Sequence, residues 1–215
     1  MIITYHGHAE FAMELSDGTV LITDPYDAHV GYAMKEHQAD AVLVSHGHGD
    51  HAYTDKIKGE YALVNEPGLW HLTHDASVEA IPSVHDEVGG AKRGKNLIMK
   101  IMAEGLTLVH LGDQGDDLTE EQVSKIAHPD VLMIPVGGFY TVDAAMARHI
   151  ADRLQPRVVI PMHYRTKYDP EMPIAELGDF LKLLNAEDPQ MPLIRLTKAD
   201  MSERPQVATL AIQPE

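Results

Sequence analysis

The chain of 215 residues contains no cysteine, only three phenylalanines and a single tryptophan. The absence of cysteine excludes disulfides, thiolate nucleophiles and any zinc site that uses sulfur. Long apolar runs are also missing, because the longest, at residues 131–136 and 158–162, are strand-sized and too short to cross a bilayer. The first six residues have neither the basic start nor the apolar centre of a secretory signal. We therefore expect a cytoplasmic protein without a membrane span.

Basic residues are scarce: 17 Lys and Arg stand against 33 Asp and Glu, which gives a formal net charge of −16. This balance disfavours nucleic acid as a partner, because phosphate backbones are bound by clustered Lys and Arg. The expected partner is a small-molecule substrate, and the sequence leaves a homo-oligomer open. Bound cations would offset part of the negative charge wherever carboxylates ligate them.

Histidine, by contrast, is abundant, with 14 residues. Because it is the commonest side-chain metal ligand, its excess directs attention to clusters of histidine and carboxylate. The length suits one well-buried core, and the hydrophobic and charged contents, 44% and 23%, are close to those of soluble globular proteins. We expect a single domain over residues 1–215.

Hydrophobic periodicity predicts strands in the first half of the chain and alternating helices and strands in the second. The predicted strands span residues 1–5, 11–15, 19–23, 41–45, 61–64, 78–81, 96–103, 106–111, 131–135, 158–161 and 206–212. The predicted helices span residues 67–73, 119–126, 142–154 and 174–184. Helices are thus available to cover both outer faces of two packed sheets, so the order predicts an α/β fold, a four-layer αββα sandwich.

The densest cluster of ligand-type residues lies at residues 45–51, which read SHGHGDH. Glycine permits backbone conformations closed to other residues, so a tight loop can aim His46 and His48 at one ion while Asp50 and His51 face a neighbour. The loop follows an apolar strand, where a rigid scaffold meets an adaptable segment. A polar surface turn with incidental histidines is the alternative, and the ligand density argues against it. The spacing predicts a two-metal site.

The sequence HGHGDH after an apolar strand resembles the HxHxDH signature of the metallo-β-lactamase superfamily. Within it, the chain resembles the small bacterial metal-dependent hydrolases that include the ascorbate-6-phosphate lactonase. The segments that carry this likeness are YHGHAEF at residues 5–11, DPY at 24–26 and PVGGFYT at 135–141. The resemblance implies a metallo-β-lactamase fold, a binuclear metal centre and hydrolase activity.

The resemblance also implies how the ligands divide between two sites. Site one would hold His46, His48 and His85, site two would hold Asp50, His51 and His163, and Asp113 would bridge. Ions about 3.5–4 Å apart can share a water molecule and lower its pKa from 15.7 to roughly 7, so the implied nucleophile is a metal-bridging hydroxide. Asp50 and Asp113 are the candidate catalytic residues, because either is placed to accept or relay a proton.

Supporting residues follow from the same resemblance. Asp24, in the segment Thr-Asp-Pro, resembles the early strand-end aspartate that holds the ligands from behind. His110 lies inside a predicted strand, so we expect a supporting or core histidine rather than a ligand. Taken singly, His85 would also be consistent with a hydrogen-bonded structural histidine and Asp113 with a turn carboxylate; their order along the chain favours ligands.

Four residues are candidates for substrate contact. They are His8, Arg93, Tyr140 and Arg165. Arg93 belongs to the one local basic run, residues 91–95, and arginine pairs well with carboxylate or phosphate. Solvated loops or a capped turn histidine would account equally for these residues. Histidine and aspartate ligands favour zinc, with manganese, iron, cobalt or nickel as alternatives.

Three functions remain open. The leading hypothesis is a metal-dependent hydrolase of a small ester, lactone or phosphodiester. The second is a phosphodiesterase or nuclease acting on nucleotides or RNA ends, which the net charge disfavours. The third is a non-catalytic metal-binding sensor or scaffold, which a complete ligand set argues against because purely structural sites close their coordination.

Overall fold

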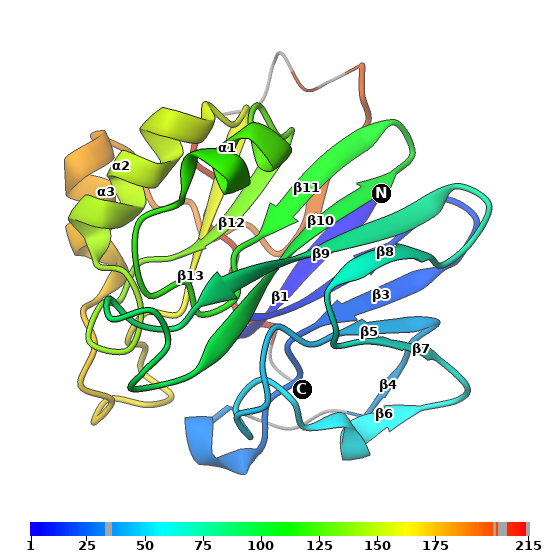
Figure 1. The fold of residues 1–215 in the computed structure, drawn as a ribbon, viewed down its shortest axis with the longest axis horizontal. Coiled ribbons are helices and arrows are strands. Elements are labelled where there is room, and N and C mark those ends of the chain that lie inside the picture. Colours follow the sequence, from blue (N-terminus) through cyan, green and yellow to red (C-terminus); the bar gives the residue numbers. More distant parts are fainter. Residues whose placement is uncertain (33–35, 200, 202–205, 214–215) are drawn as a thin grey trace.

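Two six-stranded sheets pack face to face around one apolar core (Figure 1). The computed structural model describes residues 1–32, 36–199, 201 and 206–213. The first sheet has the order β14-β1-β2-β3-β5-β7 and comprises β1 (Ile2–Gly7), β2 (Glu10–Glu14), β3 (Val20–Thr23), β5 (Ala41–Leu43), β7 (Ala62–Val64) and β14 (Ile194–Arg195). The second has the order β13-β12-β11-β10-β9-β8 and comprises β8 (Gly68–His71), β9 (Ala76–Val84), β10 (Lys95–Ala103), β11 (Leu106–His110), β12 (Val131–Pro135) and β13 (Val158–Met162).

Burial along the strands follows from these layers. In β1, Ile3 and Tyr5 are buried while Ile2 and Thr4 are partly exposed, because only one face of this strand meets the core. Every residue of β12 and β13 is buried, because these parallel strands are covered on both faces. Their sequences are accordingly continuous apolar runs.

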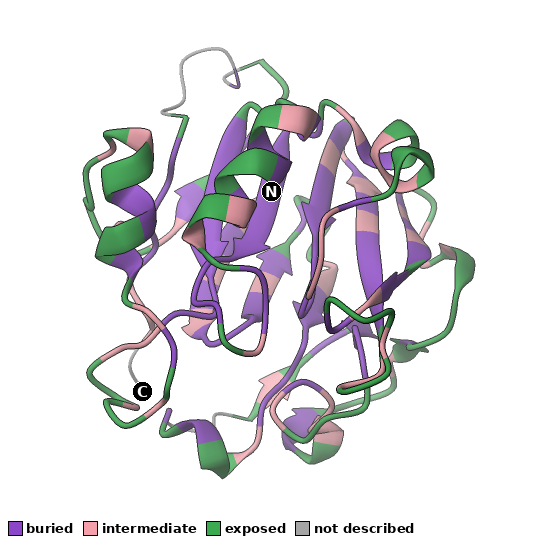
Figure 2. Cartoon of the chain, turned by 60° about the vertical axis from the view of Figure 1, so that its left-hand side comes forward, coloured by how far each residue is buried: buried purple, intermediate pink, exposed green. Residues whose placement is uncertain are grey.

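Helices cover the outer face of the second sheet (Figures 1 and 2). They are α1 (Glu120–Ile126), α2 (Ala144–Leu154) and α3 (Leu177–Leu184). Thr119 and Gln122 form a capping box at the start of α1, and Asp143 caps α2 through the amide of Met146. The apolar stripe of α2, including Ile150 and Leu154, is fully buried.

The outer face of the first sheet has a thinner cover. Ile22 and Val42 of this sheet, with Val44 just after β5, pack against Ile57. Ile57 belongs to the two-stranded pair β4 (His37–Gln38) and β6 (Ile57–Lys58). The short 3₁₀ helix η2 (Thr54–Lys56) precedes β6, and a second one, η1, spans Ala28–Val30. The predicted sandwich is confirmed, but among the described residues all three α-helices lie beside the second sheet.

Two predicted elements differ from the structure. Residues 67–73 were expected to form a helix, but Gly68–His71 is the edge strand β8, paired antiparallel with β9. A short apolar pattern does not separate the two conformations, and the long free edge of β9 favours the strand. Residues 206–212 make isolated bridges through Val207, Leu210 and Ile212 instead of a strand. No helix in the described part of the chain has the length and apolarity needed to cross a membrane.

The sandwich brings several strand ends to one edge. His8 follows β1, Asp24 follows β3, and the 45–51 loop lies just beyond β5. On the second sheet, His85 follows β9, Asp113 lies three residues after β11, and His163 follows β13. The fold therefore gathers residues separated by up to 155 positions in the sequence at a single site.

Candidate metal centre

The carboxylate of Asp113 lies among four histidine side chains. Its Oδ2 atom is 3.1 Å from Nε2 of His85, 3.4 Å from Nε2 of His163 and 4.0 Å from Nε2 of His46. Its Oδ1 atom is 3.2 Å from Nε2 of His51. Asp113 thus faces both halves of the site, which is the position required of a bridging ligand.

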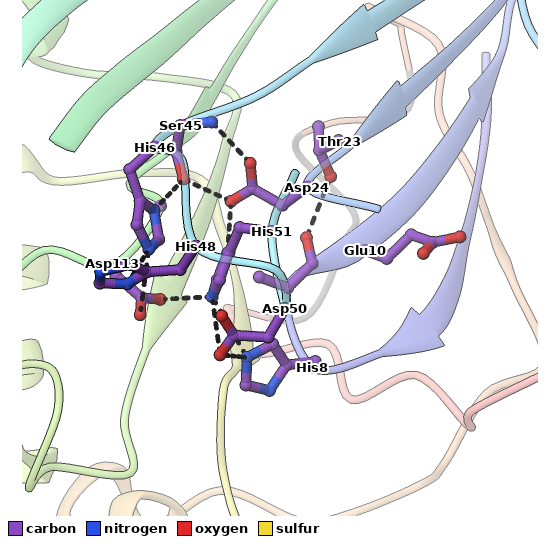
Figure 3. Close-up of polar contacts among 12 residues, drawn as sticks. His8, Glu10, Thr23, Asp24, Ser45, His46, His48, Asp50, His51 and Asp113 are labelled. Carbon is purple, nitrogen blue, oxygen red and sulfur yellow. Dashed lines mark hydrogen bonds and ion pairs between the residues drawn. The ribbon is translucent and has the colours of Figure 1, made fainter. Parts of the chain in front are cut away.

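The ligand atoms form two main groups. One consists of His46, His48 and His85, and the other of His8, Asp50, His51 and His163; within each group the atoms lie within 4.8 Å of one another. In the first, Nε2 of His46 is 3.0 Å from Nδ1 of His48. The structure therefore brings all seven sequence-predicted ligands together in the predicted division, and it adds His8 to the second group. Figure 3 shows His8 beside Asp50 and His51.

The donor set fits divalent cations. Asp113 is 2% exposed, and its Oδ1 atom makes no hydrogen bond despite the proximity of His51. Buried carboxylate oxygens normally have donors, so this atom lacks a partner that a cation would supply. Imidazole nitrogens that face one another at 3.0–3.1 Å fit the same interpretation, because a cation can accept both lone pairs. Nitrogen and oxygen donors without sulfur suit Zn, Mn, Fe, Co or Ni.

Burial and charge shift the pKa values of these groups in different directions, and a cation bound by His51 would have to displace a proton from it. Burial lowers the pKa of His46 to about 3 and that of His8 to about 4, so both imidazoles are neutral at pH 7 and can donate a lone pair. Burial opposes the ionised form of Asp113, but His163 and His51 hold its pKa well below the usual range. Burial also opposes protonation of His51, yet Asp113 and Asp24 raise its pKa well above the usual value.

Asp24 and Ser45 orient two of the ligands from behind. Asp24 Oδ2 accepts from Oγ of Ser45 at 2.7 Å and lies 2.9 Å from Nδ1 of His51. Its Oδ1 accepts from the Ser45 amide at 2.7 Å. Ser45 Oγ is also 2.9 Å from Nδ1 of His46. These contacts turn the Nε2 atoms of both histidines toward the centre. Sequence reasoning missed Ser45, although it directly precedes the first ligand.

His110 connects two of the loops at the site without reaching the ligand groups. Its Nε2 lies 2.9 Å from the carbonyl oxygen of Ala9, and its Nδ1 accepts from the amide of Gly112 at 3.1 Å. The side chain is fully buried. His110 therefore ties the turn after β1 to the turn that carries Asp113, which is the supporting place expected from its mid-strand position.

Backbone conformation at the site differs from the expectation for the glycines of the 45–51 loop. Gly47 and Gly49 do not have positive φ, and a Cβ on Gly49 would meet only the end of the Asp27 side chain, with Oδ2 at 2.6 Å, which can turn aside. Positive φ occurs at His8 (55°), Asp24 (38°) and His163 (52°). The left-handed conformations are therefore at the strand ends, where side chains turn inward.

A cavity of about 660 Å³ opens over the centre. It is lined by Asp27, His29, Val30, His48, Gly49, Asp50, His85, Arg93, Asp113, Tyr140, Asp169, Glu171, Met172 and Pro173. A larger hollow of about 770 Å³, which Arg165 lines, contains none of the predicted ligands. Four of the residues that line the smaller cavity belong to the predicted ligand set.

The four substrate-contact candidates divide between these places. Arg93 and Tyr140 line the cavity, with the guanidinium carbon 5.6 Å from the tyrosine ring centroid. Arg165 is not brought to this cavity, because its guanidinium pairs with Glu176 at 2.9 Å. His8 is 1% exposed and lies among the ligands rather than on the cavity wall.

Asp86 positions Arg93, a role that the sequence did not reveal. Its carboxylate accepts hydrogen bonds from the amides of Val88, Gly90, Lys92 and Arg93 at 2.7–3.0 Å. These four bonds lower the pKa of Asp86 to about 2 against the effect of burial. The basic run 91–95 is therefore folded around one carboxylate instead of being a loose hairpin tip. An aspartate three residues before the Gly89-Gly90 pair was the only local signal.

Comparisons with known proteins agree with this geometry. A family model described as "Beta-lactamase superfamily domain" matches residues 2–163. A UPF0173 metal-dependent hydrolase of Archaeoglobus fulgidus is 27% identical over 237 residues, covering 94% of this chain and 99% of the relative. A second, from Myxococcus xanthus, is 30% identical, with 88% and 80% covered.

A solved structure from Thermotoga maritima, assigned to the Zn-dependent hydrolases of the metallo-β-lactamase superfamily, is similar over 98% of this chain and 99% of that chain, with a TM-score of 0.80 and 32% identity. The family model covers most of the chain, and the relatives align along most of their own length. The chain therefore belongs to the metallo-β-lactamase superfamily and is a metal-dependent hydrolase.

Proposed function

We propose that the protein hydrolyses a small ester, lactone or phosphodiester at a binuclear centre. The observation that carries this proposal is the convergence of seven nitrogen and carboxylate ligands at one centre, four of which line a cavity of about 660 Å³, a volume typical of small-molecule sites. Two divalent cations, zinc or alternatively manganese, iron, cobalt or nickel, would supply a nucleophile from water at neutral pH and polarise the scissile group.

Asp50 is placed to accept the proton that the nucleophilic water loses. Its side chain is 32% exposed and lines the cavity, and Oδ2 lies 3.2 Å from Nε2 of His8. Burial opposes ionisation, but His8 and His51 lower the pKa of Asp50, so the carboxylate is ionised at neutral pH and can accept a proton. From its place on the cavity lining, Asp50 can then pass that proton to the leaving group.

The charges on the cavity wall favour a small substrate that carries one anionic group. Arg93 is the only Lys or Arg among the lining residues of the described chain, and Tyr140 lies beside it. Asp27, Asp169 and Glu171 line the same cavity. These carboxylates would repel a polyanion, which argues against the alternative of RNA or an extended nucleotide chain.

The test is elemental analysis of protein purified without added metal, together with turnover of generic ester, lactone and phosphodiester substrates before and after chelation. We expect about two equivalents of metal and turnover that chelation removes and added metal restores. Protein that neither retains nor binds zinc or manganese would contradict the proposal. Full metal binding without turnover across the panel would favour a sensor or scaffold.

Arg93→Ala should raise KM for anionic substrates by roughly 10- to 100-fold, because a hydrogen bond to a charged group contributes about 1.5–3 kcal/mol. Neutral substrates of the same class should be little affected. Lys92→Ala is the matched control, since Lys92 pairs with Glu87 and does not line the cavity. Equal effects of the two substitutions in steady-state kinetics would show that Arg93 has no specific contact with substrate.

The proposal includes a cytoplasmic location and a small-molecule partner, with neither nucleic acid nor membrane bound. It is supported by the net charge of −16 and the absence of long apolar runs. A homo-oligomer is a separate question that sedimentation would answer.

A further inference from the structure

His8 lies inside the ligand set. Its Nε2 atom is 3.1 Å from Nε2 of His51 and 3.2 Å from Oδ2 of Asp50. Its ring centroid is 4.2 Å from that of His163. Figure 3 shows the His8 ring directed at Asp50 and His51, not away from the centre. All three neighbours belong to the predicted second site.

The backbone holds His8 firmly in this position. Its φ of 55° is left-handed, which is uncommon for a residue other than glycine and persists where the surroundings enforce it. Its carbonyl oxygen accepts from the hydroxyl of Tyr5 at 2.9 Å and from the amide of His163 at 2.8 Å. His163 has nearly the same conformation, with φ of 52°. The strand ends of β1 and β13 are thus fastened together at these two histidines.

The lone pairs at this point converge. Asp24 accepts from Nδ1 of His51, which leaves Nε2 of the same ring directed at the centre. Nε2 of His8 faces that atom at 3.1 Å. In the absence of metal, one proton shared between Nε2 of His8 and Nε2 of His51 can form a hydrogen bond. A cation placed between these two nitrogens and the Asp50 carboxylate would bind all three groups at once.

We propose that His8 is an additional ligand of the second cation, beside Asp50, His51 and His163. This inference rests on the proposed binuclear centre. With Asp113 bridging, the second cation would have three nitrogen and two carboxylate ligands from the protein. That set exceeds the four ligands of tetrahedral zinc and favours a cation that accepts five or six, such as Mn, Fe, Co or Ni.

The test uses cobalt as the probe and His8→Gly as the variant, because glycine adopts a φ of 55° without strain. Bound cobalt is measured by titration against a competing chelator and by visible absorption, which strengthens as the coordination number falls. We expect wild type to bind two equivalents. His8→Gly should bind one of the two cobalt ions at least about 100-fold more weakly. Loss of a residue that only hydrogen-bonds a metal ligand weakens metal binding by up to about 100-fold, so a larger loss is expected for a ligand. The absorption of His8→Gly should be stronger, and added imidazole should restore the wild-type affinity and spectrum.

His74→Ala is the control, since the His74 side chain is 98% exposed and belongs to none of the candidate ligand groups of the described chain. It should leave cobalt affinity and spectrum unchanged. His8→Gln keeps a donor for Asp50, and full recovery of affinity in this variant would overturn the proposal by showing that His8 only hydrogen-bonds. Wild-type affinity and spectrum in His8→Gly would overturn it as well. Wild-type protein that binds no cobalt would instead overturn the binuclear centre itself.

Discussion

Asp113→Ala is expected to reduce metal-dependent turnover by more than about 100-fold. Loss of a residue that only hydrogen-bonds a metal ligand reduces activity by up to about 100-fold, and loss of a ligand should have a larger effect. Asp113→Ala should also release at least one cation. The reason is the place of Asp113 between the two ligand groups: Oδ2 faces His85 and His163 while Oδ1 faces His51, so both cations of the proposed centre would lose a carboxylate together. The measurements are kcat/KM on any responsive substrate and metal content after dialysis.

Asp116→Asn is the control for that substitution, because Asp116 lies on the same loop but lines a different hollow. It should retain both cations and turnover. Asp113→Asn tests charge separately from shape, and we expect it to behave like the alanine variant because an amide does not bridge two cations well. Two bound cations and unchanged turnover in Asp113→Ala would refute the bridging role.

Glu10→Gln is expected to destabilise the fold by about 3–5 kcal/mol, which is the usual effect of removing one partner from a buried ion pair. Glu10 is fully buried, and its Oε2 accepts from Nζ of Lys56 at 2.5 Å. His6 Nδ1 and His37 Nε2 lie 3.0 and 3.2 Å from its Oε1. The substitution would leave the buried Lys56 ammonium without its counter-ion. Figure 3 shows that the Glu10 carboxylate points away from the metal centre.

The same cluster predicts sensitivity to acid. Burial raises the pKa of Glu10, but His37, His6 and Lys56 outweigh it and lower that pKa from 4.5 to about 2. A carboxyl group whose pKa is lower in the folded state stabilises the fold above its unfolded pKa. Its contribution is lost as the pH falls from about 4.5 toward 2. Burial also lowers the pKa of His6, and this acts in the same direction below its unfolded pKa of 6.5.

Urea unfolding of chelator-treated protein between pH 7 and 3 separates this effect from protonation of the metal ligands. The difference between wild type and Glu10→Gln should shrink as the pH falls below 4.5. The double variant Glu10→Gln with Lys56→Met should recover much of the loss, since no unpaired charge remains buried. A difference below about 1 kcal/mol at pH 7 would mean that water reaches the cluster and screens it.

Site residues that lie close together in the sequence could be predicted from local spacing, whereas those far apart could not. His46, His48, Asp50 and His51 occur within six positions, so their common purpose is visible locally. His85, Asp113 and His163 are far apart in the sequence and were assigned through resemblance alone. Ser45 and Asp86 act through backbone amides and neighbouring side chains, and such contacts leave little trace in composition or spacing.

Some local patterns were overruled by tertiary context. Residues 67–73 have a short apolar pattern compatible with helix, and pairing along β9 made Gly68–His71 a strand. The basic residue after His163, Arg165, turned to Glu176 and away from the cavity. His8, considered for substrate contact, was carried by the end of β1 into the ligand set.

By itself, the sequence determined the chemistry of this protein: nitrogen and carboxylate ligands without sulfur, strands of the right period for two sheets, and a hydrolase family. These properties depend on residue type and short spacing. Only the tertiary structure decided which residues hydrogen-bond the ligands from behind, which basic side chain lines the cavity and where His8 points. Those properties depend on strand ends that are distant in sequence but meet at one edge of a sandwich, and their relative placement is set by packing of the core.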